Sequence, residues 1–188
     1  MSIAQKRNFQ QTNHGSGAFR RMSAFFEQCW QVNAPITMFG VATTLFTVAA
    51  VAGLFSEPRI IVGQPAWLKP VKFGVSIAMY SFSIIWLLGF VRAEKPWIKR
   101  TLKAFTWIVI VVFTAEIVPI TIQVLRGTRS HFNIATPFDQ FLFAVMGVSI
   151  SVLWAANLVL ALILLRQRFE DRVFGWSLRF ALIVTIAG

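Results

Sequence analysis

Long apolar stretches alternate with short polar segments along this chain of 188 residues. Four of the stretches reach about the ~20 residues that an α-helix needs to cross the ~30 Å hydrocarbon core of a bilayer. Their approximate bounds are 36–55, 70–91, 104–125 and 137–165. The apolar residues are continuous rather than alternating, which favours helices over the strands of a membrane barrel. The pattern therefore predicts an all-α integral membrane protein with four transmembrane helices.

Two further segments flank these spans. Before the first span, aromatic residues such as Phe25 and Trp30 recur at helical spacing with Arg20 and Arg21 between them, which predicts an amphipathic helix at the membrane surface. After the last span, an apolar segment over 173–188 is too short to cross the bilayer comfortably. We expect a partial fifth helix there, which a longer chain or a partner completes. The chain thus divides into a cytoplasmic or interfacial segment, 1–35, and a transmembrane bundle, 36–188.

Composition agrees with a membrane protein rather than a nucleic-acid-binding one. Hydrophobic residues make up 56% of the chain and charged residues only 13%, with a mean hydropathy of +0.67. The net charge of +11 would suggest nucleic acid in a soluble protein. Here the basic residues lie mainly between apolar stretches, and no nucleic-acid-binding motif accompanies them. The expected partner is the lipid bilayer, and nucleic acid is not expected.

The distribution of basic residues predicts the orientation, because cytoplasmic loops carry an excess of lysine and arginine. With the N-terminus inside, the inner segments hold most of them: Lys6, Arg7, Arg20, Arg21, Arg92, Lys95, Lys99, Arg100, Lys103, Arg166, Arg168 and Arg172. The outer segments hold fewer: Arg59, Lys69, Lys72, Arg126 and Arg129. We therefore expect a cytoplasmic N-terminus in a plasma or bacterial inner membrane.

Glu116 is the acid inside a span and the strongest candidate for chemistry. An ionisable group at membrane depth is costly and by default indicates a functional site. It lies three residues before Pro119, which should kink the helix, and shares a helix face with Gln123. By the helical rise, Glu116 lies ~13 Å below the outer end of its span. The functional interpretation is a carboxyl that binds a proton, an ion or a substrate. The alternative is a structural acid hydrogen-bonded between helices.

The second span offers a polar stripe that can face Glu116. Lys72, Ser76, Tyr80 and Ser83 follow one side of the predicted helix, and Tyr80 should lie at about the depth of Glu116. We therefore predict a hydrogen bond between Tyr80 and Glu116. Alternatively, the two serines bond to their own backbone and Tyr80 simply packs in the bundle.

Basic and polar groups gather where we expect the entrance to this site. Lys72 lies beside Lys69 at the start of the second span, where an anionic substrate, an anionic lipid or Glu116 can offset their charge. Both lysines can also simply extend to the interface. The loop after the third span contributes Arg126 and His131. A histidine can shuttle protons near neutral pH, although it can equally be polar surface. Asp139 is explained structurally, because Thr136 to Asp139 has the pattern of a capping box.

The remaining sequence features predict helix packing or argue against a metal site. Small residues four apart, as in Gly147, Ser151 and Ala155, predict close helix packing, and Asn157 is expected to bond between helices. The single cysteine and two separated histidines provide no metal site.

Three function classes remain open. The first is binding or translocation of a small ion or solute at an outward-facing site of Glu116, Tyr80, Gln123, Lys72, Arg126 and His131. The second is an accessory subunit of a larger membrane complex or a homo-oligomer, binding lipid, quinone or pigment. The third is a membrane-embedded enzyme using Glu116 and His131. The sequence assigns no catalytic residues and no cofactor.

Overall fold

The computed structural model describes residues 17–167, 169 and 171–187, so residues 1–16 of the predicted N-terminal segment lie outside the described part. The described chain is almost entirely helical. Its helices are α2 (Ala18–Ser56), α3 (Leu68–Leu88), α4 (Pro96–Leu125), α5 (Pro137–Leu165) and α6 (Arg172–Ala187). α2 to α5 are long and apolar enough to cross a membrane. The predicted all-α membrane class is therefore confirmed.

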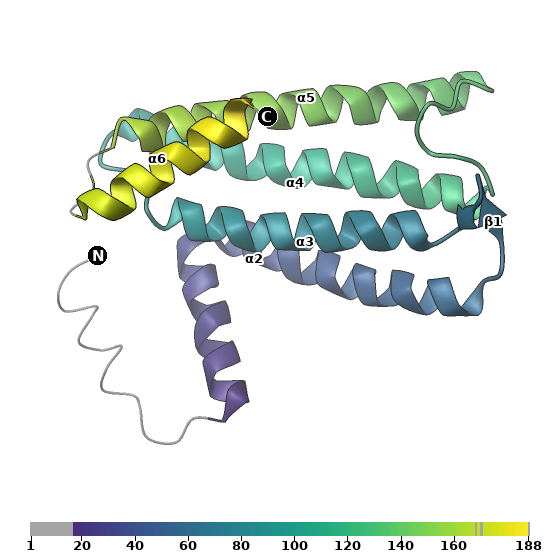
Figure 1. The fold of residues 1–188 in the computed structure, drawn as a ribbon, viewed down its shortest axis with the longest axis horizontal. Coiled ribbons are helices and arrows are strands. Elements are labelled where there is room, and N and C mark those ends of the chain that lie inside the picture. The colour runs from purple at the N-terminus through teal and green to yellow at the C-terminus, as the bar shows by residue number, and fades with distance from the viewer. Residues whose placement is uncertain (1–16, 168, 170, 188) are drawn as a thin grey trace.

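The four long helices lie side by side as two hairpins (Figure 1). α2 packs most extensively on α3, and α4 on α5, while α6 packs against α5. One end of the bundle, called the hairpin end here, carries the antiparallel pair β1 (Ile60–Ile61) and β2 (Gln64–Pro65) and the loop 126–136. The opposite end, called the kink end, carries the bend in α2, the loop 89–95 and the connection between α5 and α6.

The bend in α2 separates the predicted interfacial helix from the first span. Asn33 has non-helical backbone angles, and the chain before it leaves the bundle steeply (Figure 1). The Asn33 side chain accepts a hydrogen bond from the Ile36 amide at 3.1 Å, which caps the second half of the helix. It also donates to Thr106 Oγ1 of α4 at 2.7 Å. Pro35 then lies in the first turn of the new helix, where its missing N–H costs nothing.

Small residues bring α2 and α3 close together, as their spacing predicts. A Cβ added at Gly74 would lie 2.3 Å from Thr47 Oγ1, and one at Gly40 would lie 3.1 Å from Ser81 Cβ. A Cβ added at Gly53 would lie 2.6 Å from the ring of Trp67, which precedes α3. The α5 series behaves differently, because Gly147 has no atom within 4 Å of an added Cβ. The side of α5 that carries Gly147, Ser151 and Ala155 therefore faces outward and packs against no other helix of the described chain.

One boundary prediction is wrong. The basic segment 92–103 was expected to be a loop, yet α4 begins at Pro96 and carries Lys99, Arg100 and Lys103 on its first turns. Lys95 is extended and Pro96 occupies the first helical position, which favours helix initiation there. Hydrocarbon thickness limits the apolar part of a helix, not its full length, so α4 extends beyond the predicted span.

The outward faces of the bundle are apolar. Leu45, Val48, Trp107, Val111 and Trp154 are each more than half exposed. Exposed apolar area of this extent is unfavourable in water and is normal for helices facing lipid. These surfaces support an integral membrane protein that needs a bilayer around it.

Candidate functional site

The loop 126–136 at the hairpin end folds back over the bundle. Gly127 and Phe132 have positive φ angles of 70° and 55°, which reverse the chain twice. The Thr128 amide donates to the Gln123 carbonyl at 2.9 Å, closing the end of α4. Asn133 donates to the Arg129 carbonyl and accepts from the Ala135 amide, which holds the loop in place. This local folding places His131 against α3.

Lys69 and His131 form the first half of the site. Lys69 Nζ lies 3.0 Å from His131 Nδ1, and the imidazole ring packs beside Phe73. Burial lowers the pKa of His131 below 6.5, and the nearby charge of Lys69 lowers it further. The ring is therefore neutral near pH 7. An ammonium group has only donors, so Nδ1 must be the acceptor and the ring proton lies on Nε2. Ser130 Oγ, at 3.2 Å, also contacts this Nδ1.

Glu116 forms the second half of the site. It lies on the buried face of α4 and is only 4% exposed. Its charge interacts with that of Lys69, although no hydrogen bond or ion pair joins Glu116 to any residue that the structure describes. A charged or polar group in hydrocarbon normally finds a direct partner. The absence of one in the described chain makes this carboxyl unusual.

The space around Glu116 is not closed. Within the described residues, Arg179 Nε is the single fully enclosed side-chain polar atom without a hydrogen-bond partner. Because the Glu116 oxygens have no such partner either, they must border space that a water molecule can reach. Accessible space beside the Glu116 carboxyl suits a proton, a water molecule or a small solute.

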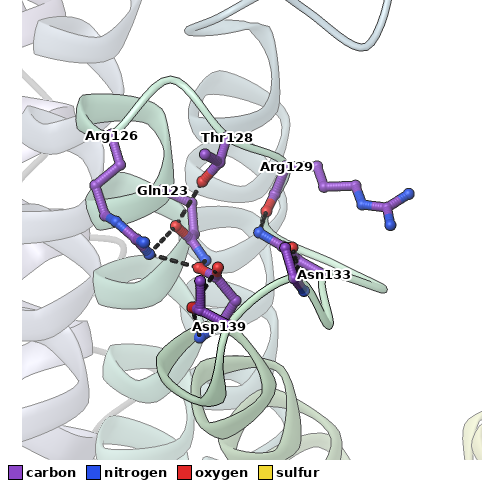
Figure 2. A network of polar contacts seen from close by, with 8 residues as sticks. Gln123, Arg126, Thr128, Arg129, Asn133 and Asp139 are labelled. Atoms are coloured by element: carbon purple, nitrogen blue, oxygen red, sulfur yellow. Dashed lines mark hydrogen bonds and ion pairs between the residues drawn. The ribbon is translucent and has the colours of Figure 1, made fainter.

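Gln123 belongs to a separate network, shown in Figure 2. Its amide nitrogen donates to Asp139 Oδ1 at 2.7 Å, and its oxygen accepts from Arg126 at 2.8 Å and Thr128 at 2.7 Å. Arg126 also pairs with Asp139 at 2.5 Å. Thr136 caps α5 through Asp139, as the sequence predicts. Gln123 and Arg126 therefore join α4 to α5, and neither side chain bonds to Glu116.

Tyr80 also has a different partner from the one predicted. Its hydroxyl donates to Asn157 Oδ1 of α5 at 2.6 Å, and its ring packs edge-on against Phe113 at 4.9 Å. The predicted Tyr80–Glu116 hydrogen bond is therefore wrong. Asn157, expected to bond between helices, supplies an acceptor near the middle of α5 and takes the only proton that the hydroxyl can donate.

The remaining stripe on α3 is exposed. Lys72, Ser76 and Ser83 all lie on the outer side of the helix. Lys72 has no hydrogen bond or ion pair with the residues that the structure describes. Of the residues singled out by sequence, Glu116 and His131 thus lie in one cluster, joined through Lys69. The sequence suggests Glu116 as one group that can offset the charge of Lys69, but it does not place Lys69 among the site residues; the position of Lys69 on the same side of α3 as Tyr80 is the signal that could have done so.

In the described part of the chain, no three histidine, cysteine, aspartate or glutamate side chains are placed to hold a metal ion. No protein-family model, curated protein or solved structure matches this chain.

Proposed function

We propose that this membrane protein binds and translocates a small ion or solute in the gap between Glu116 and Lys69. The observation that carries the proposal is the carboxyl of Glu116. It is buried at membrane depth, borders space that water can reach, and has no hydrogen-bond partner among the described residues. Intramembrane acids of this kind are typical of proton relays and ion pathways.

Lys69 and His131 control access in this proposal. The Lys69 ammonium is held by neutral His131 while it attracts Glu116 across the gap. An anion arriving from the hairpin end binds the ammonium, and a proton taken up by Glu116 removes the opposing charge. Lys72, exposed near the start of α3, adds positive potential at the hairpin end, which favours anions over cations, whereas Asp139 offsets the charge of Arg126. Tyr80 fixes α3 against α5 through Asn157 and so supports the gap indirectly.

The hairpin end faces the outside in this proposal. The kink end carries most of the basic residues of α4 and both arginines of the interfacial helix, so the cytoplasmic side is assigned there with the N-terminus. The gap then opens outward, and transport requires a second arrangement that opens it inward.

Proton flux in liposomes tests the proposal. The purified chain is reconstituted into liposomes that enclose the pH dye pyranine, and an inward gradient of chloride is applied at several pH values. We expect flux from the native chain and none from Glu116→Gln, because the amide cannot exchange a proton at these pH values. Glu94→Gln, at an exposed acid in the loop 89–95, is the matched control and should retain flux. Equal flux from Glu116→Gln and the native chain contradicts the proposal.

A subunit of a larger membrane assembly is the second candidate. The outward-facing seam of Gly147, Ser151 and Ala155 on α5 favours it, since such seams allow a second helix to approach closely. Cysteine cross-linking at Ser151 in native membranes distinguishes the two candidates. A cross-linked product supports an assembly, and a monomer at all protein densities contradicts one.

A further inference from the structure

An apolar groove lies between α4 and α5 toward the kink end, and its wall on α4 ends at Ile108, eight residues before Glu116. It has a volume of about 170 Å³. Its wall is made chiefly of apolar side chains from the two helices: Leu102, Phe105, Ile108, Ala156, Leu160 and Ile163. From 101 to 108 the helical rise gives a length of ~10 Å, parallel to the bundle.

The groove offers no hydrogen bond to a polar ligand. Its one polar wall side chain, Thr101, donates its hydroxyl proton to the Trp97 carbonyl of its own helix at 3.0 Å. A polar solute would lose its hydration there without replacement. A hydrocarbon chain has no hydrogen bonds to water that it could lose there, so the apolar wall selects an acyl chain.

Two arginines follow the groove residues toward the kink end. Arg166, which caps the end of α5, lies three residues beyond Ile163, and Arg100 lies one turn before Ala104 of the groove wall, so each shares a helix side with a wall residue. Both side chains are exposed, and neither bonds to a residue that the structure describes. The first turn of α4 carries no acid, and exposed Trp97 lies one turn before Thr101, where an interfacial anchor is expected.

We infer that this groove binds one anionic phospholipid, with an acyl chain between α4 and α5 and the phosphate against Arg100 and Arg166. The apolar wall selects the chain and the two arginines select the charge. The site lies nearer the kink end than Glu116, shares no residue with the Glu116 cluster and does not depend on the proposed transport. Each basic residue at a membrane surface strengthens anionic-lipid binding about 5-fold, so two arginines give a preference of about 30-fold.

Native mass spectrometry of the full chain in detergent tests the inference, with dioleoyl phosphatidylglycerol and dioleoyl phosphatidylcholine added at equal concentration. We expect one retained phosphatidylglycerol per chain, preferred about 30-fold over phosphatidylcholine. Arg100→Gln with Arg166→Gln should abolish the preference. Lys99→Gln with Lys103→Gln, which removes the same charge from the other side of α4, should keep it.

A second pair of variants tests the part of the site that holds the acyl chain. Ala156→Phe fills the groove and should lower retention of both lipids, whereas Ala155→Phe points outward and should not. Glycerol 3-phosphate, which has the charge without the chains, should not displace the bound lipid. Equal retention of phosphatidylglycerol and phosphatidylcholine overturns the inference. An equal loss of lipid preference in the arginine double variant and the lysine double variant also overturns it. If Ala156→Phe does not fold, the charge pairs still decide the result.

Discussion

Gly74→Ala is the sharpest test of how closely α2 and α3 pack. The new methyl carbon would lie 2.3 Å from Thr47 Oγ1 and 3.4 Å from the Thr47 Cα, so Thr47 must move. Overpacking of this kind costs ~1–3 kcal/mol. Alanine is also better than glycine in a helix by ~1 kcal/mol, so the net loss is smaller by that amount.

Gly147→Ala is the matched substitution, because it is chemically identical and meets no atom within 4 Å. It should gain the ~1 kcal/mol of helix propensity without the steric cost. The two variants should therefore differ by ~1–3 kcal/mol in the free energy of unfolding. Thr47→Ala removes the clashing hydroxyl and should restore most of the stability of Gly74→Ala. Unfolding in mixed micelles, followed by tryptophan fluorescence, measures all four chains. Equal stability of the two glycine variants, or no rescue by Thr47→Ala, would refute the packing described here.

Two further predictions concern the hairpin end. The pKa of His131 is lower in the folded chain than its unfolded value of ~6.5, so the unfolded state binds more protons between the two values. Stability should therefore fall as the pH drops below ~6.5, and His131→Asn, which keeps an acceptor but does not titrate, should lose this dependence in thermal unfolding between pH 5 and 8. Gln123→Met, of similar shape, removes three hydrogen bonds and should destabilise by ~2–4 kcal/mol in micelle unfolding; a loss below ~1 kcal/mol would contradict the role of the network.

The sequence predicts the spans well because hydrocarbon imposes a length and a polarity on each of them. The predicted fourth span coincides with α5, and the predicted start of the first span at residue 36 lies three residues after the bend at Asn33. Glu116 was expected to be sheltered by other helices for the same reason, and it is buried on α4.

The pairing of side chains between helices was predicted poorly. The helical period and the distance from the ends of the spans place Tyr80 and Glu116 at one depth in the membrane. The rotation of α3 about its axis, however, decides which neighbour the Tyr80 hydroxyl contacts. That rotation follows from the close packing of Gly74 of α3 on α2 and of Gly40 of α2 on α3, and it brings Tyr80 to Asn157. The Lys69–His131 contact depends on a loop whose shape follows from positive φ angles at Gly127 and Phe132. Phe132 in particular carries no sequence signal for such a conformation.

The most direct test of the central claim compares two buried acids in the same chain. Glu116 is 4% exposed and Asp139 2%, yet only Asp139 is enclosed by hydrogen bonds to described residues. Membrane-embedded protein is treated with dicyclohexylcarbodiimide, which modifies reachable carboxyls in apolar surroundings, and the sites are read by peptide mass spectrometry. The account predicts that Glu116 is modified, that Asp139 is not, and that modification stops proton flux. An unmodified Glu116, or full flux after its modification, would contradict it.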